Sequence, residues 1–105
     1  MLPREWEMVA ARRSISEGVP VLDVREAAER VGVRIPGSLW IPIGELVARW
    51  RELPLASPVV VQCSAGSRSF RASRFLREHG VSAIAMVGGI SAWRAAGGAI
   101  ESGPL

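Results

Sequence analysis

The sequence predicts a single α/β domain, over residues 1–105, built on a mostly parallel sheet of four to five strands. Short apolar runs bracketed by turn-forming residues alternate with amphipathic segments, which is the pattern of strands joined by crossover helices. Three successive valines at 59–61 suit a strand that is buried on both faces of such a sheet. A chain of 105 residues is long enough for one hydrophobic core and too short for two.

The first expected elements are a helix, a strand and a helical turn. Apolar residues at roughly helical spacing predict an amphipathic helix from Arg4 to about Glu17, with Gly18 as its stop. The apolar run over 20–24 is too short for a helix and is bracketed by turn formers, so it predicts a buried strand. A short helical turn is expected over 26–30.

The middle of the chain adds two strands separated by a helix. The apolar run over 39–41, closed by Pro42, predicts a short strand. Apolar residues that share one face predict a helix over 43–53. The valine-rich segment Val59–Gln62 is the clearest strand of the sequence, because β-branched residues pack well in a buried sheet.

The last third of the chain predicts a helix, a strand and a second helix. The first helix runs from Ser67 or Ser69 to about His79 and stops at a glycine. A further apolar run predicts a strand over 82–87. After a double-glycine turn, the final helix is expected over 90–96.

Cys63 is the only cysteine, and it lies where the valine-rich strand ends and the next helix begins. A thiol reacts as its anion, which is favoured by a helix N-terminus, by unpaired backbone N–H groups and by nearby cations. The small residues at 64–67 let several N–H groups converge on one anionic centre, and Arg68 adds a cation. A buried structural cysteine is the alternative, since free cysteine is often a small hydrophobe. The setting favours a nucleophile.

Composition and charge restrict the partners. The net charge is +3, and the thirteen cations, all arginines, are mixed with ten acidic residues and form no basic tail, so nucleic-acid binding is a minor hypothesis. No apolar run reaches the length of a membrane span, so we expect a cytoplasmic protein without a membrane partner. A single cysteine excludes an intrachain disulfide and a multi-cysteine zinc site, and we expect no metal.

Four motifs, in this order along the chain, resemble the rhodanese-like sulfurtransferases in their single-domain form. They are Leu22-Asp23-Val24-Arg25-Glu26, Ile35-Pro36-Gly37-Ser38, Cys63-Ser64-Ala65-Gly66-Ser67-Arg68-Ser69, and Gly88-Gly89-Ile90 followed by Trp93 and Gly97. The third is similar to the active-site loop of that family: a cysteine, two variable residues, a glycine, a variable residue, an arginine and a serine. The resemblance implies a rhodanese-like three-layer α/β/α fold.

The resemblance also implies a chemistry. Cys63 would take a sulfane sulfur from thiosulfate or a persulfide, hold it as a covalent persulfide, and pass it to a thiophilic acceptor such as cyanide or a thiol. No metal or organic cofactor is needed. The implied substrate-binding loop consists of Ser64, Ala65, Gly66, Ser67, Arg68 and Ser69.

Two alternative functions are kept. The first is a persulfide carrier that delivers sulfur to an acceptor protein rather than turning over a small donor. The second, ranked lower, is a cysteine-based phosphatase. Related phosphatases with this fold place five residues between the cysteine and the arginine, whereas this chain has four, and a tighter loop suits one sulfur atom better than a phosphate.

Several charged residues have two interpretations. Arg68 either aims its guanidinium at thiosulfate or supports the loop by bonding its carbonyls. Asp23 and Arg25 are candidates for the border of the pocket, although a structural salt bridge with Glu26 or Glu29 is favoured.

Two expectations remain for the rest of the chain. Arg71, Arg74 and Arg77 continue at helical spacing and form either a stripe that steers anions or a solvated helix face, the second being favoured for Arg77. The short N-terminus implies that the first strand usual in this family is reduced to Met1-Leu2 or missing.

Overall fold

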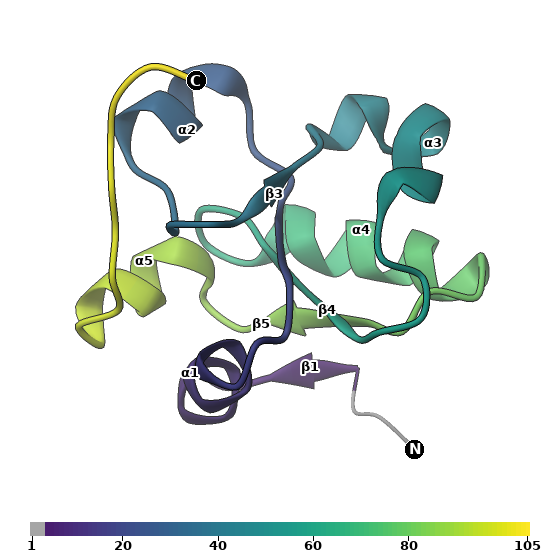
Figure 1. Ribbon diagram of the computed structural model, residues 1–105, viewed down its shortest axis with the longest axis horizontal. Coiled ribbons are helices and arrows are strands. Elements are labelled where there is room, and N and C mark those ends of the chain that lie inside the picture. The colour runs from purple at the N-terminus through teal and green to yellow at the C-terminus, as the bar shows by residue number, and fades with distance from the viewer. Residues whose placement is uncertain (1–3) are drawn as a thin grey trace.

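Five strands form one sheet in the computed structural model, which describes residues 4–105 (Figure 1). The strands follow the spatial order β1-β5-β4-β2-β3, and each neighbouring pair is parallel. They are β1 (Glu5–Trp6), β2 (Val21–Asp23), β3 (Leu39–Trp40), β4 (Val59–Gln62) and β5 (Ala83–Met86). Their carboxyl ends therefore lie along one edge of the sheet, where ligands bind in such folds.

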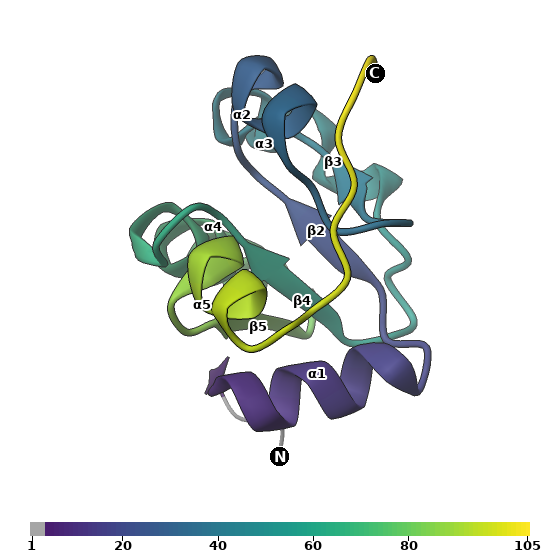
Figure 2. The ribbon, with the colours of Figure 1, turned by 90° about the vertical axis from the view of Figure 1, so that its left-hand side faces the viewer.

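Helices cover both faces of the sheet, so the expected three-layer α/β/α arrangement is confirmed (Figure 2). The α-helices are α1 (Met8–Ser16), α2 (Ala27–Gly32), α3 (Leu46–Arg49), α4 (Ser67–Glu78) and α5 (Gly89–Ala95). One hydrophobic cluster joins β4 to α3 and α4, and a second joins β4 and β5 to α1 and α5. Within the described range, no helix has the length and apolar character that crossing a membrane requires.

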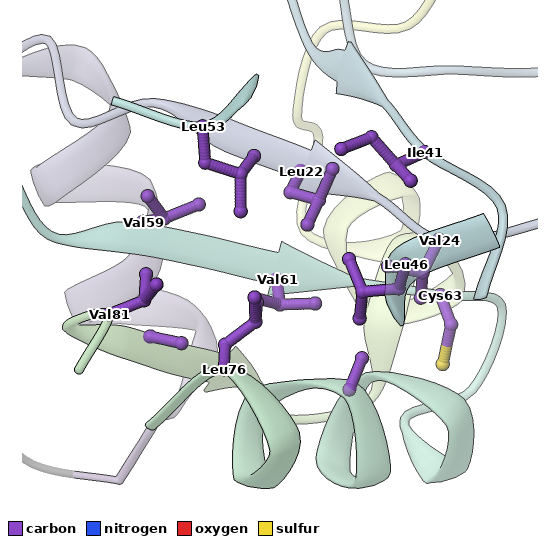
Figure 3. Close-up of a cluster of buried hydrophobic side chains, with 12 residues drawn as sticks. Leu22, Val24, Ile41, Leu46, Leu53, Val59, Val61, Cys63, Leu76 and Val81 are labelled. Atoms are coloured by element: carbon purple, nitrogen blue, oxygen red, sulfur yellow. The ribbon is translucent and has the colours of Figure 1, made fainter. Parts of the chain in front are cut away.

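The central strand β4 sends alternate side chains to the two faces. Val59, Val61 and Cys63 belong to the cluster that packs against α4, whereas Val60 belongs to the cluster on the opposite face. All four residues are buried. Figure 3 shows the Cys63 sulfur at the end of the first cluster, beyond the tip of β4. The apolar run that makes this strand a core element thus also delivers the thiol to the carboxyl edge of the sheet.

The N-terminal segment differs from the sequence expectation. The first helix begins at Met8 rather than Arg4, and Glu5–Trp6 forms the edge strand β1 instead. The carbonyls of Arg4 and Trp6 accept hydrogen bonds from the N–H groups of Ala85 and Val87, so pairing with β5 overrides the helical pattern. The first strand is therefore present, whereas the alternative position at Met1-Leu2 lies outside the described residues.

The helix expected over 43–53 is broken into three pieces. A 3₁₀ turn, Ile43–Glu45, precedes α3, and a second 3₁₀ turn, Trp50–Glu52, follows it. The segment is confined between Pro42 and Pro54, and 3₁₀ turns are common where a helix is this short. The other expected strands and helices are present, with bounds that differ by a few residues.

Candidate functional site

Cys63 lies in a seven-residue loop, residues 63–69, that we call the Cys63 loop. The loop leaves the end of β4 and enters the first turn of α4. Gly66 adopts φ +114°, a left-handed conformation that suits glycine, and this turn folds its N–H back onto the preceding thiol. The Gly66 N–H donates a hydrogen bond to Cys63 Sγ over 3.0 Å. The small residues of the loop thus place a backbone donor on the sulfur, as the sequence predicts.

Ser69 makes a second polar contact with the thiol. Cys63 Sγ lies 3.5 Å from Ser69 Oγ, and the hydroxyl donates to the carbonyl of Gly66 over 3.0 Å. A serine hydroxyl carries one hydrogen, so it donates either to this carbonyl or to the sulfur. With a neutral thiol, the S–H donates to Ser69 Oγ. With a thiolate, rotation of the buried hydroxyl turns Ser69 into a donor to the anion.

The loop favours the anionic form of Cys63. Burial opposes it, because only 1% of the residue is exposed and desolvation raises the pKa of a thiol. The Ser69 hydroxyl and the backbone N–H groups of Ser69, Gly66 and Arg68 act in the opposite sense, and the net pKa of Cys63 lies below its ordinary value. The main lowering cause is therefore hydrogen bonding at a helix start, and the Arg68 guanidinium also interacts electrostatically with Cys63.

The double-glycine turn holds the loop from the other side. The N–H groups of Ile90 and Ser91, in the first turn of α5, donate to the carbonyls of Cys63 and Ser64 over 2.8 and 3.1 Å. This approach requires Gly89, because a Cβ at that position would lie 2.3 Å from the Cys63 carbonyl oxygen. The N–H groups at the start of α5 thus fix the carbonyls of the Cys63 loop. The N–H groups of the loop itself remain directed at the Cys63 sulfur.

Arg68 has a partner that the sequence interpretation missed. Its guanidinium pairs with both carboxylate oxygens of Glu29, each over 2.7 Å, and a third bond reaches the hydroxyl of Ser64. That hydroxyl also donates to Glu29 over 2.6 Å. The prediction that Arg68 bonds the loop carbonyls is therefore wrong, because its guanidinium binds the carboxylate of Glu29 on α2 instead. That the Arg68 guanidinium is directed at thiosulfate stays a prediction.

Glu29 is positioned by the start of its own helix. Its carboxylate accepts from the N–H of Glu26 over 3.0 Å, and the Glu26 side chain accepts in return from the N–H of Glu29, a reciprocal capping box. Hydrogen bonding to Arg68 is the main reason why the pKa of Glu29 lies far below its usual range. Two acidic residues three positions apart at a helix start indicate a capping box in the sequence. That spacing gives no indication that Glu29 also binds Arg68.

Asp23 and Arg25 form a buried ion pair at the end of β2. The guanidinium of Arg25 contacts both carboxylate oxygens of Asp23 over 3.0 Å and donates to the carbonyls of Glu29 and Val33. The sequence favoured a salt bridge to the side chain of Glu26 or Glu29. That partner is wrong, because Arg25 and Asp23 pair with each other. Among the bonds of residues 4–105, none joins either side chain to the Cys63 loop, and a border role stays a prediction.

Arg30 completes this cluster. It pairs with Asp23 over 3.2 Å, bonds to Ser38, and lies 5.9 Å from the centre of the Trp40 ring. The buried charge of Asp23 is therefore shared by two guanidinium groups, and the loop that follows α2 is tied to the sheet.

A buried cysteine held by backbone N–H groups at the carboxyl edge of a parallel sheet defines the class of this protein, an α/β domain built around a cysteine whose surroundings favour its anionic form. The family model described as the Rhodanese-like domain matches residues 7–96. The chain belongs to the rhodanese-like family, as the four motifs predicted.

Individual relatives agree with the family. A sulfurtransferase of Allochromatium vinosum is 33% identical over 88 residues, which cover 83% of this chain and 82% of that protein. The provisionally named sulfur carrier protein YrkF of Bacillus subtilis is 36% identical over 78 residues, covering 73% of this chain but 42% of YrkF. The crystal structure of a rhodanese-related protein from Thermoplasma volcanium superposes with a TM-score of 0.88 at 32% identity, covering 94% of this chain and 98% of that one.

Proposed function

We propose that the protein is a sulfurtransferase that carries sulfane sulfur as a persulfide on Cys63. The observation that carries the proposal is the buried Cys63 sulfur with the Gly66 N–H 3.0 Å away and the Ser69 hydroxyl beside it. Such a site stabilises an anionic sulfur, and a terminal persulfide is anionic in the same way. The lone thiol works in its reduced state, so a reducing compartment such as the cytoplasm suits the reaction.

In the first step, the Cys63 thiolate attacks the outer sulfur of thiosulfate. A sulfur–sulfur bond forms to Cys63, the bond to the central sulfur breaks, and sulfite leaves with the bonding electron pair. A low-molecular-weight persulfide reacts in the same way and releases its thiolate. With 1% of Cys63 exposed, attack at a terminal atom of a compact donor is favoured over attack at a shielded centre.

In the second step, an acceptor removes the outer sulfur. Cyanide attacks it and leaves as thiocyanate, or a thiolate attacks it and leaves as a new persulfide, and Cys63 returns to the thiolate in either case. The N–H donors of the Cys63 loop stabilise both the persulfide anion and the departing thiolate. Two half-reactions through one covalent intermediate give ping-pong kinetics.

The environment of Arg68 bears on the choice of substrate. Glu29 takes up two of its donors, so one positive charge near the loop is already neutralised within the protein. A dianionic phosphate would need that charge, whereas a single sulfur atom does not. This supports sulfur transfer over phosphate hydrolysis, in line with the four residues between Cys63 and Arg68.

Mass spectrometry tests the proposal directly. After incubation with thiosulfate, the intact protein should gain the mass of one sulfur atom on Cys63, and cyanide should remove it with formation of thiocyanate. Cys63→Ala should gain no sulfur while keeping its circular dichroism spectrum. A wild-type protein that remains unmodified by thiosulfate and by glutathione persulfide alike would overturn the proposal.

A carrier function is the second candidate, and the similarity to YrkF favours it. In that case the persulfide of Cys63 is passed to a protein thiol, and thiosulfate is only a convenient donor. The two functions separate in the second half-reaction. A carrier transfers sulfur to an acceptor protein much faster than to cyanide or a free thiol at equal concentration.

A further inference from the structure

A groove lined by arginines lies along α4, outside the Cys63 loop. Its lining residues are Arg4, Phe70, Arg74, Arg77 and Glu78, and it encloses about 520 Å³. Four of them lie at helical spacing on one face of α4, and Arg4, just before β1, closes the groove through a hydrogen bond from Arg77 to its carbonyl. We call this surface the arginine groove.

The arginine groove carries more positive than negative charge. Three guanidinium groups face the single carboxylate of Glu78, which contacts Arg74 over 3.4 Å. Both side chains of that pair are mostly exposed, 77% and 62%, so the pair contributes little. Along this part of α4 the described residues therefore leave an unneutralised cationic surface, which supports the anion-steering interpretation of the helix.

The sequence analysis favoured a solvated position for Arg77, and the structure contradicts this. Arg77 is half-buried and donates to the carbonyls of Arg4 and Ala83 over 3.3 Å, which fixes its guanidinium between α4 and the sheet edge. The pKa of Arg77 is lowered mainly by burial, and the positive charges of Arg4 and Arg74 lower it further. The groove thus has a rigid cationic floor, and an anionic group placed there would relieve mutual repulsion.

The arginine groove reaches the Cys63 loop at Phe70. This side chain is 50% exposed, and its N–H donates to the carbonyl of Gly66, whose own N–H binds the Cys63 sulfur. Phe70 directly follows Ser69, which contacts the same sulfur. A ligand in the groove would therefore begin one residue after the Cys63 loop and extend along α4, which is about 18 Å long at 1.5 Å per residue.

We propose that the arginine groove docks an acidic segment of the protein that accepts sulfur from Cys63. The inference rests on the proposed sulfur transfer and adds the chemistry of the acceptor: carboxylates for the arginines and an apolar side chain for Phe70. The Glu78 carboxylate within the groove opposes a continuous phosphate backbone, and the basic residues of the chain are mixed with acids. An acidic protein segment is thus favoured over a nucleic acid.

Direct binding tests the groove without depending on sulfur chemistry. Two labelled peptides are compared by fluorescence anisotropy on Cys63→Ala, one with a leucine among glutamates and one with glutamines in place of the glutamates. The glutamate peptide should bind at least about tenfold more tightly at low salt, and the difference should shrink at about 0.5 M salt. Equal affinity for the two peptides would overturn the inference.

Matched variants locate the contact. Arg74→Glu should weaken binding of the glutamate peptide about tenfold, and Arg74→Gln by a smaller factor. Arg13→Glu makes the same charge change on α1, across the sheet, and should leave binding unchanged. Unchanged binding to both Arg74 variants, or a single-stranded RNA that binds more tightly than the glutamate peptide, would contradict acidic docking.

Transfer kinetics connect the groove to the chemistry. With persulfidated wild-type protein, a cysteine placed at the end of the glutamate peptide should accept sulfur faster than the glutamine version. Arg74→Glu should remove that advantage while leaving transfer to cyanide unchanged. If no persulfide forms but peptide binding behaves as expected, the proposed sulfur transfer fails and the docking surface stands. If cyanide accepts sulfur but the peptides do not differ, the docking inference fails alone.

Discussion

Glu29 and Arg68, 39 residues apart in sequence, are joined by two parallel hydrogen bonds of 2.7 Å. The pair connects the first turn of α2 to the first turn of α4. Ser64, bonded to both side chains, brings the Cys63 loop into the same contact. Two helix starts and the loop between strand and helix are therefore held by one carboxylate, whose position is set by its own capping box.

Glu29→Gln should destabilise the protein. The change leaves a half-buried guanidinium without its charged partner, and we expect the free energy of unfolding to fall by about 1–2 kcal/mol in urea titrations at pH 7. The exposed Glu17→Gln is the control and should change it by less than about 0.5 kcal/mol. A carboxyl whose pKa falls on folding stabilises above its unfolded pKa, so the difference between wild type and variant should shrink below about pH 4.

Ser69→Ala should raise the pKa of Cys63. The variant loses the hydroxyl that turns to the thiolate, so the absorbance titration of the thiolate near 240 nm should shift to higher pH. Thiosulfate turnover should fall at pH 6–7 and recover at alkaline pH. Ser73→Ala is the matched control, because the Ser73 hydroxyl is buried one turn later and has no bonding partner among residues 4–105. An unshifted titration in Ser69→Ala would contradict the hydroxyl's role.

Gly89→Ala should be among the most damaging substitutions. The added methyl group would collide with the carbonyls of Cys63 and Ser64 at 2.3 and 2.7 Å. Gly97→Ala separates this clash from backbone strain, since Gly97 has φ +82° but no neighbour within 4 Å of an added Cβ. We expect a loss of about 1–2 kcal/mol for Gly97→Ala, and at least twice that for Gly89→Ala, measured by denaturant unfolding. Equal losses would show that close packing at Gly89 is unimportant.

Asp23→Asn should cost far more than loss of a surface pair. Asp23 is fully buried and binds both Arg25 and Arg30, so the neutral side chain leaves two cations under-compensated. We expect about 3–5 kcal/mol. Glu101→Gln breaks the Arg34 pair, whose carboxylate side is 48% exposed, and should cost no more than about 1 kcal/mol. The comparison of the two midpoints of thermal unfolding checks the ranking.

The layers of this fold were predictable because the buried segments have recognisable local patterns of apolar and turn-forming residues. Val59–Val61 indicates a buried strand whatever surrounds it, and the small residues after Cys63 indicate a tight turn. The strand at Glu5–Trp6 was not predictable, since two residues carry no period and only pairing with β5 defines them. The partner of Arg68 escaped for a related reason: it depends on where α2 is placed in space, which no spacing along the chain records.

The hydrogen bonds from Ile90 and Ser91 to the loop carbonyls have a practical consequence for protein engineering. The loop backbone is held by contacts to residues elsewhere in the chain, whereas the side chains of Ala65 and Ser67 point to solvent-exposed positions within it. These two positions are therefore suitable for randomisation. A library built there would vary the exposed surface of the Cys63 loop while Cys63 and its hydrogen-bond donors stay in place, so selectivity among sulfur donors is open to directed evolution.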